Sequence, residues 1–238
     1  MTLAGRPVET DLAAADWVAE ALRDATDPVV GSLLPPFPAY ARVFHPAIRY
    51  DGDDDVEVPW AEVAEANGTL AHPLMEWGSI TGSMEFFEED NQSPLWDDAP
   101  AMGHLPEQVA AVLARVLRRH TTAAEQCWFG LSGHWGVGPP GAQLAAGARA
   151  FVLVRGPLEL AAANFVPEPS DQSANVWWPA DRAWFVATDI DLVTTYVGGS
   201  EALVADLLAE KGLEVARASV DQSTASDADT VNPLPPDA

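Results

Sequence analysis

Two strand-like segments follow one another between residues 183 and 199. They read AWFVATDI and LVTTYVGG, and both are rich in the β-branched and aromatic residues that favour strands. Only a few residues near Asp191 are left to join them, so we expect a β-hairpin. The Gly198-Gly199 pair ends the second strand, and Ser200 is a good N-cap for a helix that follows it.

Helices alternate with further strands along the rest of the chain. Apolar periodicity and capping signals predict helices over residues 11–26, 59–67, 106–120 and 200–211, the first ended by Asp27-Pro28. Further strands are predicted at residues 41–44, 127–131, 151–158 and 213–220. Helices mixed with sequence-adjacent strands indicate an α+β fold, a mostly antiparallel sheet with packed helices in a single domain.

The domain is predicted to occupy residues 11–220. Residues 1–10 are expected to form a flexible N-terminus. From Asp221 to residue 238 the sequence DQSTASDADTVNPLPPDA is polar, acidic and proline-bearing. Such a segment buries too little apolar surface to offset its ordering entropy, so we predict a disordered tail.

Charge sets the class of partner. The chain of 238 residues has 36 acidic against 12 basic residues, a formal net charge of −24, and Lys211 is its only lysine. Nucleic acid is an unfavourable ligand because phosphate contacts need clustered Lys and Arg, and an anionic membrane is disfavoured for the same reason. A basic protein would instead be attracted at long range.

The cellular compartment is predicted from the lack of a signal peptide, a membrane span and a cysteine pair. The segment MTLAGRPVETDLAAADW has no apolar core of a signal peptide, and no stretch reaches the length of a membrane span. Cys127 is the single cysteine, so no disulfide can form within the chain. We therefore expect a soluble cytoplasmic protein.

An acidic stretch, DGDDDVEVPWAE, has the spacing of a calcium loop. Oxygen-bearing side chains occupy its positions 1, 3, 5, 7 and 12. Calcium loops have glycine at position 6, because the chain turns sharply there. In this sequence position 6 is Val56, and position 9 is Pro59. The alternative is an acidic surface loop before a helix, and no other cofactor is predicted. The calcium candidates are Asp51, Asp53, Asp55, Glu57 and Glu62.

A second candidate site lies in the segment WWPADRAWFVATDID. Tryptophans could stack on a ligand while an arginine and two aspartates supply directed hydrogen bonds. The alternative is a core strand and a turn, in which neighbouring tryptophans point to opposite faces and at most one joins the core. The turn would span residues 179–182, with Asp181 paired locally. The candidate ligand or partner residues are Trp135, Trp177, Trp178, Arg182, Asp189 and Asp191.

Nucleophile and zinc chemistry receive little support. Cys127 and His134 could form a thiol and its base, but Cys127 alternates with Phe129 and Leu131 on a predicted strand, which favours a buried, inert thiol. The histidines have no zinc-ligand spacing, and neither GxGxxG nor GxSxG occurs. No catalytic residue is predicted.

Three segments resemble an uncharacterised family of proteins from high-GC actinomycetes. They are LLPPFPAYARVFHPA, CWFGLSGHWG and WWPADRAWFVATDIDLVTTYVGGSEALVADLL. We know of no activity attached to that family, so no residue role follows from the resemblance. The segment LLPPFPAYARVF is also similar to the opening of SMI1/KNR4-type immunity proteins, which suggests a module that binds another protein.

Two functions therefore compete. The first is a non-catalytic binding protein, an immunity or regulatory module for a basic protein partner. The second is a small-molecule-binding protein or hydrolase with a pocket lined by tryptophan, aspartate and arginine.

Overall fold

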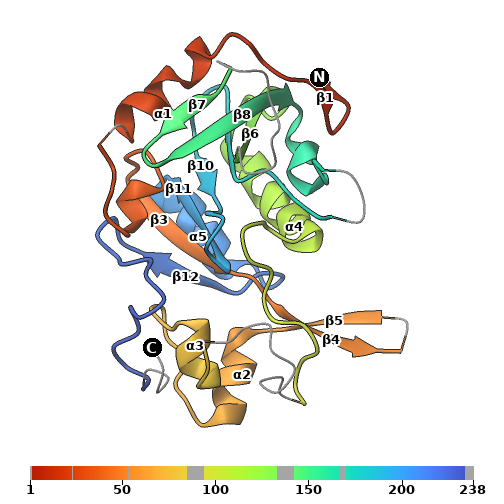
Figure 1. Cartoon of the computed structure of the whole chain (residues 1–238), viewed down its shortest axis with the longest axis vertical. Coiled ribbons are helices and arrows are strands. Elements are labelled where there is room, and N and C mark those ends of the chain that lie inside the picture. The colour runs from red at the N-terminus through yellow and green to blue at the C-terminus, as the bar shows by residue number, and fades with distance from the viewer. Residues whose placement is uncertain are drawn as a thin grey trace.

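The computed structural model describes residues 2–22, 24–52, 54–84, 94–132, 142–166 and 170–233. Its main element is a sheet of eight antiparallel strands in the spatial order β12-β3-β11-β10-β9-β6-β8-β7 (Figure 1). The predicted α+β class is confirmed. The strands are β3 (Ala39–Phe44), β6 (Cys127–Ser132), β7 (Leu144–Ala146), β8 (Arg149–Gly156), β9 (Val176–Pro179), β10 (Phe185–Ala187), β11 (Thr194–Gly199) and β12 (Val215–Ala218).

The hairpin expected around Asp191 is present at the centre of this sheet. β10 and β11 pair antiparallel, with Val186 opposite Val197. β11 then pairs with β3, which comes from far earlier in the chain. The β10–β11 connection carries Asp189 and Asp191 to one end of the sheet.

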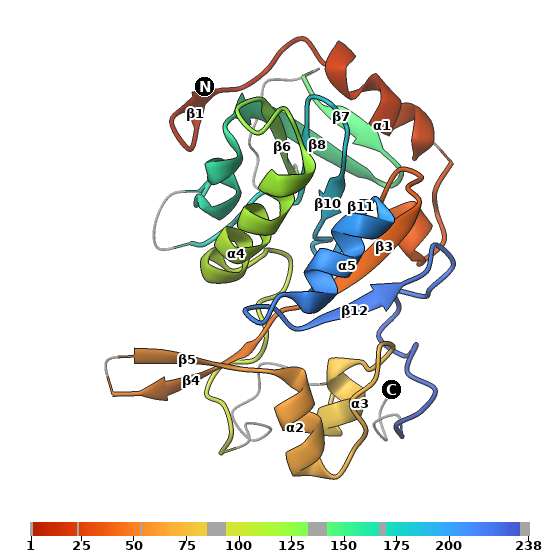
Figure 2. The same cartoon turned by 180° about the vertical axis from the view of Figure 1, so that it is seen from behind.

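Helices cover both faces of the sheet (Figures 1 and 2). α4 (Glu107–Leu117) and α5 (Glu201–Ala209) share one apolar core with one sheet face. α1 (Asp16–Ala21) packs on the other face and contributes to a second apolar core. The short 3-10 helices η1 (Ala13–Ala15) and η2 (Val30–Ser32) belong to the same core. The described chain also contains the short 3-10 helices η4 (Arg118–His120) and η6 (Leu158–Ala162). A central strand therefore buries successive side chains alternately into two cores.

A third apolar cluster lies beyond one edge of the sheet, at the bottom of Figure 1. It includes α2 (Trp60–Asn67) and α3 (Trp77–Thr81), together with Trp96. The ring centroid of Trp77 is 5.3 Å from that of Trp60 and 5.1 Å from that of Trp96. We name these three side chains the tryptophan cluster.

One strand of the sheet connects directly to the tryptophan cluster. Arg42 of β3 is 2% exposed, and its Nη2 donates to both carboxylate oxygens of Glu76 at 2.9 and 3.0 Å. Its guanidinium also lies 4.8 Å from the Phe44 ring centroid and 5.7 Å from that of Trp60. Charge pairing and cation–π contacts thus fix α3 and α2 to the sheet.

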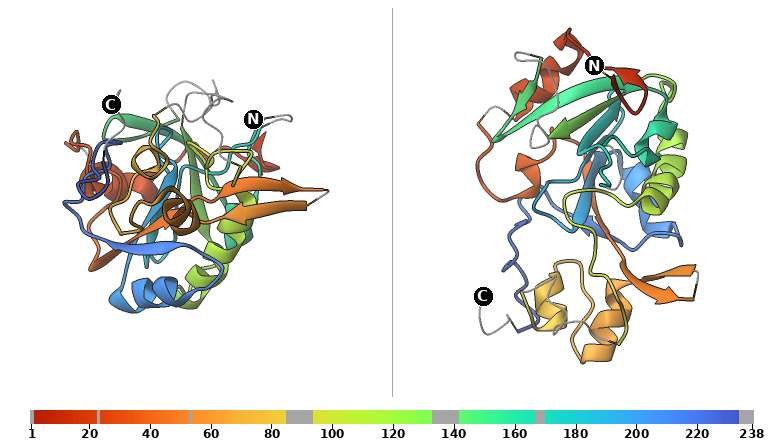
Figure 3. Two further views of the ribbon diagram at one scale, coloured as in Figure 1. Left: turned by 90° about the horizontal axis from the view of Figure 1, so that it is seen from below. Right: turned by 45° about the vertical axis from the view of Figure 1, so that its right-hand side comes forward.

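A second hairpin projects from the part of the molecule that contains α2 and α3, as Figure 3 shows. β4 (Ala47–Asp51) pairs antiparallel with β5 (Asp54–Val58), and Gly52 in the turn has φ of 70°. The sequence suggested a loop here, because its dense carboxylates mask the alternation that marks a strand. We name residues 47–58 the acidic hairpin.

The ends of the chain also differ from expectation. β1 (Thr2–Leu3) and β2 (Arg6–Pro7) form a small antiparallel pair where a flexible N-terminus was predicted. Within the expected disordered tail, Asn232 accepts a hydrogen bond from Leu70 N at 2.8 Å and donates to Leu70 O at 3.0 Å. Asn232 is 7% exposed and Asp229 is 3% exposed. Residues 221–233 are held by specific polar contacts, which composition does not reveal; residues 234–238 lie outside the described residues.

In the described part of the chain, no helix has the length and apolar character that crossing a membrane requires.

Candidate functional site

Trp177 and Trp178 are both core residues. They lie on β9, face opposite sides of the sheet, and are each 1% exposed. Trp177 stacks on Phe129 with 6.2 Å between ring centroids, and Trp178 stacks on Phe185 at 5.3 Å. The expectation that only one of them joins the core is wrong, because helices cover both faces of the sheet. Neither indole presents a surface to a ligand.

Arg182 lies at the opposite end of β10 from the two aspartates. The predicted turn forms, with Arg182 N donating to Pro179 O at 2.9 Å. Arg182 has φ of 56°, and its guanidinium lies 5.3 Å from the ring centroid of Trp17. Trp135 lies outside the described residues.

Asp181 makes the expected local hydrogen bond, from Ala183 N at 3.3 Å, and is also held by residues distant in sequence. Its carboxylate accepts from the Thr121 hydroxyl at 2.8 Å and from Thr122 N at 2.8 Å. These hydrogen bonds outweigh partial burial and lower the pKa of Asp181. Asp181 therefore joins the turn after β9 to the segment that precedes β6.

Asp189 and Asp191 come together on Arg149, a residue that sequence reasoning missed. Arg149 Nε and Nη2 donate to the Asp189 carboxylate at 3.0 and 2.7 Å, and Nη2 also donates to Asp191 at 2.6 Å. Hydrogen bonding to Asp189 is the largest cause that raises the pKa of Arg149. Arg149 begins β8, forty residues before Asp189, and no signal in the sequence joins the two positions.

Two cavities meet at this ion-pair cluster. A mainly apolar cavity of about 30 Å³ and an open groove of about 320 Å³ share Ser32, Leu33, Ala146, Arg149 and Asp189 as lining residues. The smaller cavity has room for only a few water-sized groups. The carboxylates of Asp189 and Asp191 already neutralise Arg149, so this groove offers no unpaired positive charge to an anion.

The calcium candidates do not gather around one point. Asp51 and Asp55 lie on the two strands of the acidic hairpin, opposite Asp54 and Tyr50 respectively. Glu62 lies in the first turn of α2, and Asp53 lies outside the described residues. Position 6 of the proposed loop, Val56, is paired within the ladder, so the chain here is extended and does not wrap. Over the described ranges no three His, Cys, Asp or Glu side chains could hold a metal ion together.

One face of the acidic hairpin surrounds Tyr50 with carboxylates. Tyr50 is 54% exposed; its hydroxyl donates to Asp98, and its backbone N donates to Asp97 at 2.6 Å. The Asp98 hydrogen bond is the main cause that raises the pKa of Tyr50 to about 12. The register places Asp55 directly opposite Tyr50, and Glu57 two residues further along the same face.

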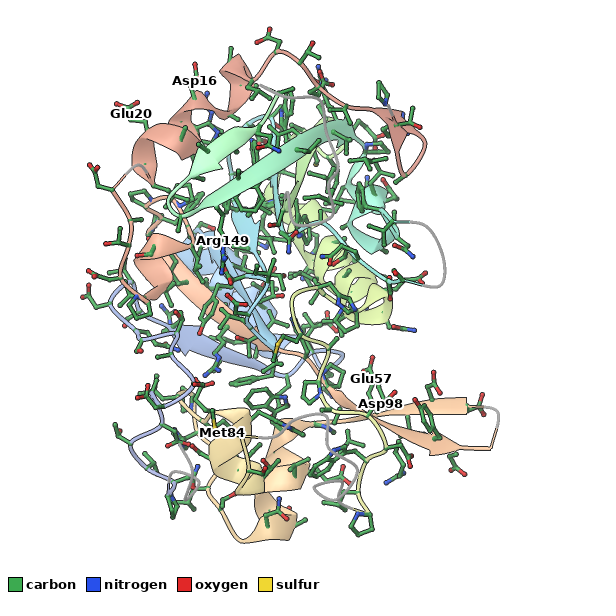
Figure 4. All side chains as sticks on the ribbon, viewed as in Figure 1. Asp16, Glu20, Glu57, Met84, Asp98 and Arg149 are labelled. Atoms are coloured by element: carbon green, nitrogen blue, oxygen red, sulfur yellow. The ribbon has the colours of Figure 1, made fainter. Side chains whose placement is uncertain are left out.

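This face lacks a compensating cation among the residues that the structure describes. No ion pair joins Asp55, Glu57 or Asp98 to a described basic side chain. Arg49 belongs to the hairpin, but alternation places it on the opposite face. Figure 4 shows Glu57 and Asp98 close together where the hairpin leaves the body of the protein.

Five of the twelve basic side chains form ion pairs with carboxylates in the described part of the chain, and the pair of Arg42 with Glu76 is one of them. Four of them form ion pairs far from the acidic hairpin: Arg118 with Glu159, Arg119 with Asp206, Arg149 with Asp189, and Arg217 with Glu201. These ion pairs neutralise positive charges of the chain at places away from the hairpin. The carboxylates of the hairpin therefore stay strongly negative.

A cleft of about 300 Å³ opens at the base of the acidic hairpin, and we name it the hairpin cleft. The carboxylate of Glu214 accepts from Trp60 N at 2.6 Å and from Ala61 N at 2.9 Å, and so caps α2. Burial nevertheless raises the pKa of Glu214, and partial burial also raises that of Glu57. The lining residues are Phe44, Pro46, Glu57, Pro59, Ala61, Val109, Lys211, Gly212, Leu213 and Glu214.

Cys127 is the buried thiol that the sequence favoured. It is 0% exposed on β6, and burial raises its pKa to about 12. A thiol in this state is neither a nucleophile nor a metal ligand at neutral pH. His134, its suggested base, lies outside the described residues.

Comparison of the chain with protein-family models, with curated proteins and with solved structures gives no match.

Proposed function

We propose that this chain is a non-catalytic binding module, of the immunity or regulatory kind, for a basic protein partner. The acidic hairpin carries the proposal, because it holds its carboxylates away from the body of the protein on an exposed, aromatic-centred face. The hairpin is held in this position by its base, where Ile48 N donates to Asp98 O at 2.9 Å and Asp97 N donates to Ile48 O at 2.7 Å. Its acidic side chains contribute nothing to the three apolar cores.

Charge and aromatic chemistry together favour a protein partner. Complementary charge raises the rate of encounter and selects against acidic proteins. Tyr50 adds the amphipathic ring that is enriched where protein interfaces have their strongest contacts. A small-molecule pocket built on Trp177 and Trp178 has less support, since both indoles are buried.

The test is affinity capture of proteins from native host lysate, at low and at high salt, with three forms of the protein. The hairpin triple variant carries Asp55→Asn, Glu57→Gln and Asp98→Asn. The α1 triple variant carries Asp16→Asn and Glu20→Gln on α1 and Asp24→Asn shortly after it, which change the net charge equally away from the hairpin (Figure 4).

We expect the natural protein and the α1 triple variant to retain a basic protein at low salt and to release it at high salt. The hairpin triple variant should retain at most about one tenth as much, which corresponds to about 1.4 kcal/mol of lost binding. Equal retention by both variants would refute docking at the hairpin. Capture of no basic protein by any form would refute the proposed function.

A further inference from the structure

We infer that the hairpin cleft receives an arginine side chain of the basic partner. This inference rests on the proposed function, and it assigns the cleft its ligand: a guanidinium group carried on an aliphatic stem.

The walls of the cleft suit the stem. Ring and aliphatic carbons of Phe44, Pro46, Pro59 and Leu213 line it. The three methylene groups of an arginine side chain bury well along such a surface while the charged end stays polar. The volume of about 300 Å³ leaves room for one long side chain.

The polar lining suits the guanidinium. Two carboxylates, those of Glu57 and Glu214, belong to the cleft. Each Glu214 oxygen accepts one backbone N–H of α2, so the carboxylate is held in place, and each oxygen can accept a further donor. Burial raises the pKa of both groups, as expected of carboxylates that have lost water without gaining a cation.

Arginine fits this lining better than lysine. Its planar fork of donors can bond two acceptors at once, and it is less strongly hydrated than an ammonium group, so its transfer into a partly buried cleft costs less. Lys211 lines the same cleft and forms no ion pair with a described acidic residue. Its ammonium group therefore opposes an incoming guanidinium.

The experiment compares two peptides by nuclear magnetic resonance titration of the ¹⁵N-labelled full chain. The first is N-acetyl-Gly-Arg-Gly-amide, and the second replaces arginine with citrulline, which has nearly the same shape but no charge. The amides of Ala61 and Gly212 report on the cleft because both residues line it.

We expect the arginine peptide to bind up to about fivefold more tightly than the citrulline peptide, since about 1 kcal/mol is the upper end of the range for a partly exposed ion pair. Glu57→Gln should abolish this preference. Lys211→Gln should raise the affinity for the arginine peptide about twofold to threefold, because it removes a like charge. Glu20→Gln on α1 is the matched control and should change neither affinity.

Equal affinities of the two peptides would overturn the inference, as would an arginine preference that Glu57→Gln and Glu20→Gln leave equally intact. Unchanged amide spectra away from the cleft verify that each variant is folded. The two proposals fail separately. Capture of a basic protein without arginine preference overturns the cleft assignment alone, whereas arginine preference without any captured protein supports the cleft and overturns the protein partner.

Discussion

His45 lies just beyond β3, completely buried, and a hydrogen-bonded series of side chains fixes its tautomer. Its Nδ1 is 2.6 Å from Ala101 O, which can only accept, so Nδ1 carries the proton. Nε2 then accepts from the Thr195 hydroxyl at 2.8 Å, and Thr195 accepts from the Thr188 hydroxyl at 2.6 Å. Burial is the main cause that lowers the pKa of His45 to about 4. The ring is therefore neutral at physiological pH, and protonation breaks the series.

The lowered pKa of His45 predicts that the stability of the protein depends on pH. The unfolded chain binds a proton at His45 near pH 6.5, whereas the folded chain binds it only near pH 4. Between these values the unfolded state holds more protons, so the free energy of unfolding falls as the pH falls. We expect His45 to account for a loss of about 3 kcal/mol between pH 7 and pH 4.

Urea unfolding from pH 7 to pH 4 measures this loss. His45→Gln should be less stable than the natural protein at pH 7 and should lose less stability on acidification. His120→Gln, which removes a partly exposed side chain paired with Asp206 at 2.9 Å, is the control and should keep the stability loss that we assign to His45. Identical pH dependence in the natural protein and His45→Gln would contradict the assignment.

At the scale of elements, the sequence predicts those whose signals are local. The short β10–β11 connection, the apolar face of α4 and the Ser200 cap of α5 each appear within about twenty residues. Ser200 Oγ accepts from Leu203 N at 3.2 Å, as an N-cap does. Elements fixed by partners elsewhere in the fold were missed, namely β1, β2, β4, β5, β7, α3 and the tail contacts. Their sequences are polar or short, and only tertiary contacts order them.

For the candidate site too, the sequence predicted only those features whose signals are local. Asp189 and Asp191 were predicted because they follow a strand, but Arg149, which binds both, comes from another strand. The burial of Trp177 and Trp178 depends on helices packing on both faces of β9. A strand covered on both faces is expected to be a continuous apolar run, as Val176 to Trp178 is, but so short a run does not show which elements cover it.

The docked tail gives a prediction about an element. Asn232→Ala removes both hydrogen bonds to the Leu70 backbone and one to Asp229. We expect a loss of about 1 to 3 kcal/mol in the stability of the docked tail, because the hydrogen bonds of a side chain that is only 7% exposed are lost. Hydrogen exchange should accelerate at the Leu70 amide and in residues 224–232. Asp221→Ala, at an exposed tail position, is the control; equal protection in both variants would show that the tail docks by other contacts.

At the scale of the whole molecule, a net charge of −24 opposes the compact state. The ion pairs of Arg118, Arg149 and Arg217 offset this repulsion at particular points. The acidic hairpin has no such compensation in the described structure, which concentrates repulsion in one projecting element. A protein partner of opposite charge would relieve it.

Salt should therefore stabilise the protein. Raising sodium chloride from about 0.01 M to about 0.1 M shortens the screening length from about 30 Å to about 10 Å. We expect the Tm to rise by about 2 to 4 °C, which is about 1 kcal/mol for a chain of this size. The hairpin triple variant should gain less from the same salt when both are followed by calorimetry. A Tm that falls with added salt would mean that the ion pairs outweigh the repulsion.

Lys211 is the only lysine of the chain and lines the hairpin cleft. Amine-directed chemistry consequently has a single side-chain target, and that target lies beside the surface to which we assign the partner. A reagent that joins two amines would therefore link a bound protein to this chain through the Lys211 side chain. Peptide mapping of the linked product would then identify which amine of the partner lies beside the cleft, without any label having to be introduced.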